Sequence, residues 1–244
     1  MDPCNRGRFF PLGRKELDKM SKIWYLSPSS QGGNVGIGDY GTEQDQMYRL
    51  ADAIIPHLDR AGVSFVLADR DAKLAKRVAE SNQMGAGFHL CLHSNAGGNG
   101  KAWGPVALYY SDAGKTFGEK LVASLLALGQ ANNRSYNVKA EKSLYELRHT
   151  AAPACLLEVD FHDSAVGVEF LTKRRSEIAE AIARCIIEAD GKEFVPITDG
   201  EYADDAVRLG LFPANTAWDE PMTRAEAAAM VMKLKVLMEK AVGA

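Results

Sequence analysis

Four residues of this sequence have side chains suited to metal-dependent hydrolysis. Glu43 lies in the first turn of an expected helix, His93 ends an apolar run, and Glu158 and His162 lie in and just after the run ACLLEVDF. Imidazole and carboxylate groups bind zinc, and a carboxylate beside the ion can act as a general base. Glu43 is also favoured by the helix dipole alone, and His93 could be a polar cap. Glu158 is more informative, because a carboxylate is costly to bury unless it is paired or near a cation.

The elements that position these residues are short apolar runs that alternate with amphipathic stretches. Strands are predicted at 23–27, 63–67, 87–92, 104–110 and 154–161, and helices at 42–61, 71–84, 116–128 and 164–188. Thr42 is the expected N-cap of the first helix, and Gly62 ends it. The alternation predicts the α/β class, with a twisted, mainly parallel sheet flanked by helices. Sites in such sheets gather at the carboxyl ends of the strands, where the four candidate residues lie.

The composition suits one sizeable domain with a small appendage. Of 244 residues, 46% are hydrophobic and 25% are charged, which excludes a disordered chain. The net charge of −3 gives no basic field for nucleic acid. We expect a leader or disordered tail at 1–21, the main domain at 22–191, a linker at 192–204 and a small helical hairpin at 205–244.

Neither a membrane span nor a signal peptide is visible in the sequence. No apolar stretch reaches the roughly 20 residues that a membrane span needs. The first residues are basic but lack the apolar region of a secretory signal. We therefore expect synthesis in the cytoplasm without a visible export signal.

The four cysteines are widely scattered. Cys91 and Cys155 lie inside apolar runs, which favours buried free thiols over a disulfide. A thiol hydrolase that used either cysteine with His89 or His93 is disfavoured, because thiolates do not form readily in apolar surroundings.

Five blocks in order resemble the zinc amidases of the N-acetylmuramoyl-L-alanine amidase type 3 family. They are IWYLSPSSQGGN, GDYGTEQDQMYRLADAI, DRDAKLAKRVAESNQMGA, FHLCLHSNAGG and SLYELRHTAAPACLLEVDF, spread over about 170 residues. The resemblance implies cleavage of the amide bond between N-acetylmuramic acid and the first L-alanine of peptidoglycan. By position, Glu43 and His93 match two zinc ligands of the family, and Glu158 matches its catalytic glutamate.

The sequence departs from the family where the first histidine ligand is expected. Ser30 falls at that position, and serine is a poor zinc ligand, with Gln31 and Asn34 scarcely better. His162 is the proposed replacement, since period-two alternation would place Glu158, Asp160 and His162 on one face of their strand. The alternatives are that His162 binds substrate or caps the following helix. His149 is disfavoured because it precedes the strand.

The resemblance leaves two other functions open: a cell-wall-binding protein on a catalytically inactive amidase fold, and another zinc amide hydrolase or peptidase. An enzyme without an export signal would reach the wall after lysis or through a holin. Residues 205–234 resemble one S-layer homology motif, with a capping box at Thr223 and Glu226. This segment is a candidate for binding a wall polymer, for dimerisation, or for packing on the main domain.

Overall fold

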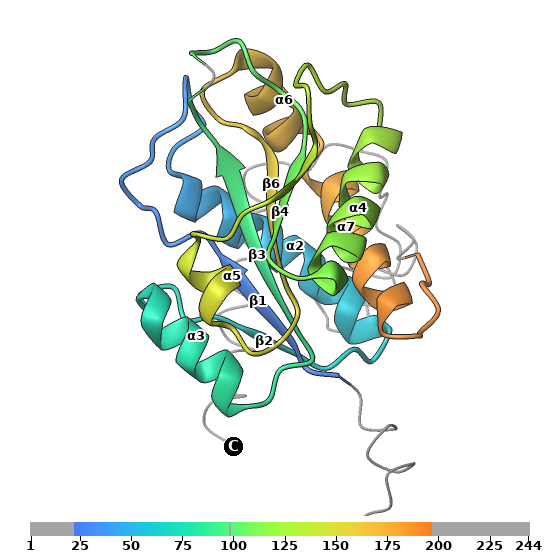
Figure 1. The fold of residues 1–244 in the computed structure, drawn as a ribbon. Coiled ribbons are helices and arrows are strands. Elements are labelled where there is room, and N and C mark those ends of the chain that lie inside the picture. The colour runs from blue at the N-terminus through green and yellow to red at the C-terminus, as the bar shows by residue number, and fades with distance from the viewer. Residues whose placement is uncertain (1–21, 98, 197–244) are drawn as a thin grey trace, which may run out of the picture. The chain divides into compact units, whose positions relative to one another are not determined.

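The computed structural model describes residues 22–97 and 99–196 (Figure 1). The expectations for a tail at 1–21 and a helical hairpin at 205–244 lie outside the described residues, as does most of the predicted linker. None of the described helices has the length and apolar character needed to cross a lipid bilayer.

Six strands form one sheet in the order β2-β1-β3-β6-β4-β5. The strands are β1 (Trp24–Pro28), β2 (Phe65–Leu67), β3 (Phe88–Asn95), β4 (Val106–Tyr109), β5 (Val138–Ala140) and β6 (Ala154–Phe161). All neighbouring strands are parallel except β4 and β6, which are antiparallel. The predicted α/β class and the mainly parallel sheet are confirmed.

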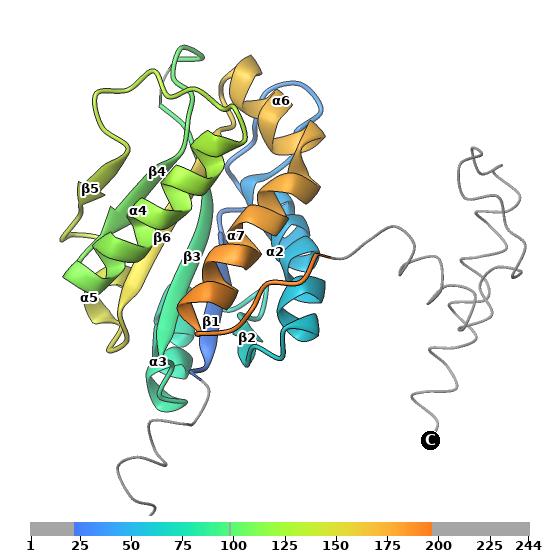
Figure 2. The same ribbon diagram turned by 90° about the vertical axis from the view of Figure 1, so that its right-hand side faces the viewer.

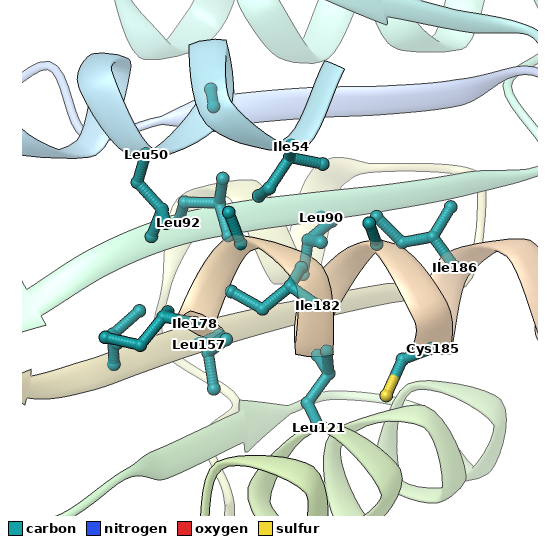
Figure 3. Close-up of a cluster of buried hydrophobic side chains, with 14 of the residues drawn as sticks. Leu50, Ile54, Leu90, Leu92, Leu121, Leu157, Ile178, Ile182, Cys185 and Ile186 are labelled. Carbon is teal, nitrogen blue, oxygen red and sulfur yellow. The ribbon is translucent and has the colours of Figure 1, made fainter. Parts of the chain in front are cut away.

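Helices cover both faces of this sheet (Figure 2). They are α2 (Glu43–Arg60), α3 (Leu74–Gln83), α4 (Asp112–Ala127), α5 (Tyr145–His149), α6 (Ala165–Lys173) and α7 (Arg175–Ala189). The main core lies between the sheet and α2, α4 and α7, where Leu50, Leu90, Leu121 and Ile182 pack together (Figure 3). The opposite face packs against α5 in a smaller cluster around Leu147 and Leu156.

Three helices differ from their predicted bounds by more than two residues, and one of them, α3, begins at Leu74, three residues later than predicted. α4 begins at Asp112, four residues earlier than predicted, because Ser111 caps it and accepts a hydrogen bond from the N–H of Gly114. A Cβ at Gly114 would lie 2.1 Å from the Ala154 carbonyl oxygen, so this glycine permits close packing of helix on sheet despite its low helix propensity. The long helix predicted at 164–188 is two helices, α6 and α7, with a break at Arg174.

Candidate active site

Glu43 is fixed at the start of α2, as predicted. Thr42 is the N-cap, and its hydroxyl accepts a hydrogen bond from the N–H of Asp45 at 3.1 Å. The N–H of Glu43 donates to the Asn34 carbonyl at 2.8 Å, which joins the helix to the loop after β1. The Glu43 side chain is only 1% exposed, and its Oε2 accepts a hydrogen bond from Asn34 Nδ2 at 2.8 Å. The carboxylate is therefore held rigidly at this edge of the sheet.

His93 lies next to Glu43, as the family resemblance implies. Its Nδ1 is 2.8 Å from Glu43 Oε1. That oxygen is buried, so the carboxylate and the imidazole meet out of contact with bulk water. The two atoms are at ion-pair distance, and both belong to side chains of the types that bind zinc.

The electrostatics of this pair favour the charged form of each group. Burial alone would raise the pKa of Glu43, but contacts with His93, Asn34 and Ser29 outweigh it and place the pKa below its ordinary value. Burial alone would lower the pKa of His93, but Glu43 and Glu158 raise it above its ordinary value. The imidazole therefore lies in a strongly negative environment, which also suits a cation.

Glu158 completes the group from the neighbouring strand. It pairs with His93 in the register of β3 and β6. Its Oε2 is buried without a hydrogen-bond partner. Burial raises the pKa of Glu158 to about 7, with Glu43 adding to the rise and His93 opposing it. Glu158 is therefore a buried carboxylate within electrostatic range of both Glu43 and His93.

The structure does not bring His162 into this group. Its Nδ1 lies 2.9 Å from Ser94 Oγ, which in turn lies 2.8 Å from the Tyr40 hydroxyl, and the rings of His162 and Tyr40 stack. The third-ligand role of His162 stays a prediction, and these contacts give it no support.

The expectation that Glu158, Asp160 and His162 share one face is wrong. The register shifts after the His93–Glu158 pair, so that Asn95 comes opposite Phe161. β6 therefore advances three residues while β3 advances two, which is a bulge that reverses the alternation. Phe161 therefore lies on the same face of the strand as Glu158. The next residue, His162, turns towards Ser94.

Asp160 and His149 lie apart from the candidate ligands. Asp160 Oδ1 accepts hydrogen bonds from the N–H groups of Gly104 and Phe161, and Gln130 donates to its other oxygen. Asp160 therefore stabilises the strand end and does not contact a ligand imidazole. His149 is exposed at the end of α5 and packs against Tyr145.

A polar network below the site was not predicted from the sequence. His89 Nε2 lies 3.1 Å from Glu146 Oε1, His89 Nδ1 lies 3.0 Å from Ser81 Oγ, and Ser27 Oγ donates to Glu146 Oε1 at 2.6 Å. The buried Arg77 donates to Ser27 Oγ at 3.3 Å. The sequence does contain a signal of this network, since Ser27 and His89 are polar residues inside apolar strands. Their partner Glu146 lies on α5, a helix that was not predicted from the sequence.

Part of this network has the composition of a metal site. Across the described residues, His89, Cys91 and Glu146 are the one group of three such side chains whose donor atoms all lie within 4.8 Å of one another. Both imidazole nitrogens already have partners, and burial raises the pKa of the Cys91 thiol far above its ordinary range. We interpret the group as a satisfied structural network. Cys91 and Cys155 are buried free thiols, as predicted.

The family model of N-acetylmuramoyl-L-alanine amidase, Amidase_3, matches residues 26–188. The chain belongs to this family. No curated protein matches the chain at a significant level.

Solved amidase structures share the fold. The catalytic domain of CwlV from Bacillus (Paenibacillus) polymyxa var. colistinus is 21% identical with a TM-score of 0.62, covering 70% of this chain and 99% of that one. AmiC2 of Nostoc punctiforme is 22% identical with a TM-score of 0.62, covering 70% and 97%. The catalytic domain of the CD27L endolysin, which targets Clostridia difficile, is 22% identical with a TM-score of 0.58, covering 69% and 98%. At these identities the likeness supports the fold alone.

Proposed function

We propose that this chain is a zinc-dependent enzyme that hydrolyses the amide between N-acetylmuramic acid and the first L-alanine of peptidoglycan. The observation that carries the proposal is the buried Glu43–His93 pair, whose Oε1 and Nδ1 lie 2.8 Å apart, next to Glu158, which is opposite His93 in the register of β3 and β6 and has its pKa raised to about 7. Membership in the N-acetylmuramoyl-L-alanine amidase family supports the choice of substrate.

Glu43 and His93 are the residues that would hold the metal ion. Their donor atoms are adjacent, and both side chains are buried. A zinc ion bound there supplies a water of near-neutral pKa and polarises the scissile carbonyl group. Asn34 would keep the second carboxylate oxygen of Glu43 in place, since it donates to that oxygen at 2.8 Å.

Glu158 is the proposed general base. With a pKa of about 7, its carboxylate is basic enough to accept a proton from the attacking water. A new C–O bond forms at the carbonyl carbon, the C–N bond breaks, and Glu158 returns the proton to the leaving nitrogen. The muramic acid is left with a free carboxyl group, and the peptide begins with a free L-alanine.

The cell wall is the proposed place of action, because peptidoglycan is the proposed substrate. Release through cell lysis or a holin-type pore would bring the enzyme there. Binding of a wall polymer by the S-layer-homology-like segment at 205–244 remains a prediction, since this segment lies outside the described residues.

Mass analysis of digested peptidoglycan tests the proposal. We expect the wild-type protein to release peptides with a free L-alanine terminus, and Glu158→Gln to release none above background. Glu169→Gln is the matched control, because Glu169 is exposed on α6 and pairs only with Lys173 among the contacts described. Glu169→Gln should release as much of these peptides as the wild type does.

The alternative functions give different products. Cleavage within the stem peptide, with alanine still attached to muramic acid, would identify a peptidase on the same fold. Binding of the wall with no cleavage at any zinc concentration would identify a wall-binding protein. Equal product from Glu158→Gln would contradict the role of Glu158.

A further inference from the structure

The Gln31 side chain lies next to His93 and is linked to Glu43 through Asn34. Its Nε2 lies 3.4 Å from His93 Nδ1, the same nitrogen that faces Glu43. Its Oε1 accepts a hydrogen bond at 2.7 Å from Asn34 Nδ2, which also donates to Glu43 Oε2. The terminal amide of Gln31 is thus connected to both candidate ligands.

We propose that the side-chain amide oxygen of Gln31 is the third protein ligand of the metal ion, an inference that rests on the metal site of the proposed function. In the structure the amide nitrogen of Gln31 faces His93 Nδ1 and the amide oxygen faces Asn34. A turn of the terminal amide exchanges the two atoms and directs the lone pairs of the oxygen towards the cation position.

The backbone of the loop holds Gln31 in this place. The N–H of Gln31 donates to Ser29 Oγ at 3.1 Å, and the Gln31 carbonyl accepts from the N–H of Asn34 at 3.2 Å. The N–H of Ser29 donates to the Leu92 carbonyl at 2.8 Å, which ties the loop to the strand that carries His93. Gln31 is therefore held by the loop after β1, which also binds Glu43, and this loop is tied to β3, which carries His93.

The chemistry of an amide oxygen sets the expected metal preference. Carbonyl oxygens suit hard cations such as Mn²⁺, whereas imidazole suits zinc. A Glu–His–Gln ligand set should therefore bind zinc more weakly, and discriminate less against Mn²⁺, than a set with a second imidazole. Gln31→His should raise the affinity for zinc more than the affinity for Mn²⁺.

The test is zinc and Mn²⁺ binding to the metal-depleted full chain, measured by competition with a chromophoric chelator. We expect Gln31→Ala to weaken zinc binding by about tenfold to a hundredfold. Gln83→Ala is the control, because Gln83 is exposed at the end of α3. Ser30→His places an imidazole beside Gln31, and in that background the loss caused by Gln31→Ala should be smaller.

The outcomes separate this inference from the proposed function. If His93→Ala abolishes zinc binding while Gln31→Ala binds zinc as the wild type does, Gln31 is not a ligand and the amidase proposal stands. If the wild-type chain binds no zinc, the metal site fails and both proposals fail with it. Circular dichroism of each variant shows that a change in affinity is not a loss of fold.

Discussion

His93 Nδ1 and Glu43 Oε1 lie 2.8 Å apart, and both side chains are buried. A buried ion pair gains little net stability once the desolvation of its two groups is counted. The proposed function gives this pair another role, which is to bind a cation.

Zinc should stabilise the wild-type chain and not His93→Ala. A ligand that binds only the folded state stabilises it by about 2.7 kcal/mol at a concentration of a hundred times its Kd. We therefore expect an upward shift of the melting temperature on adding zinc to metal-depleted wild type. His149→Ala, which removes an exposed imidazole at the end of α5, should retain the whole shift. An equal shift in His93→Ala would place the zinc elsewhere.

The stability of the metal-depleted chain should fall with rising pH because of Glu158. Its pKa is raised by burial from 4.5 to about 7 in the folded chain. The folded state therefore binds the proton more tightly, so this contribution is fully present below pH 4.5 and is lost as pH rises through 7. The loss should amount to about 3–4 kcal/mol, at about 1.4 kcal/mol per pKa unit.

Denaturant unfolding of the wild type and Glu158→Gln, both in chelator, measures this effect. The difference in free energy of unfolding between the two should grow in favour of Glu158→Gln from pH 4.5 to 8 and then level off. Parallel curves across this range would show that Glu158 titrates normally.

The network below the site should contribute to stability. Glu146→Ala leaves His89 and the Ser27 hydroxyl without their buried partner, which should cost about 2–4 kcal/mol of unfolding free energy. Glu180→Ala is the control, since it removes only an exposed pair with Arg184 on α7 and should cost less than about 0.5 kcal/mol. Similar losses in the two variants would contradict a structural role for the network.

His162→Ala distinguishes the two candidates for the third ligand. We expect this variant to retain its bound zinc, because the His162 ring contacts Ser94 and Tyr40 and not the Glu43–His93 pair. Elemental analysis of the purified, zinc-loaded protein gives the zinc content per chain. A chain without zinc would restore the ligand role predicted for His162 from the sequence.

Features set by local chemistry were predictable from the sequence. Thr42 and Glu43 occupy the first positions of α2 because capping depends on a few neighbouring residues. His93 ends an apolar run and Glu158 lies late in another, and parallel pairing of β3 and β6 brings the two residues opposite each other.

Features set by tertiary contacts were not predictable. The bulge in β6 turns His162 away from Glu158, and period-two alternation contains no sign of it. The first turn of α4 packs on the sheet because Gly114 lies against the Ala154 carbonyl, a contact that helix propensity does not include. The approach of Gln31 to His93 depends on a loop whose path is set by hydrogen bonds to β3 and α2.

The most direct test of the account is peptidoglycan digestion by the metal-depleted chain, before and after one equivalent of zinc is added. We expect no free L-alanine termini before the addition and their release after it, with none from Glu43→Ala treated in the same way. Release of the same peptides in the presence of excess chelator would contradict a metal-dependent site built on Glu43 and His93.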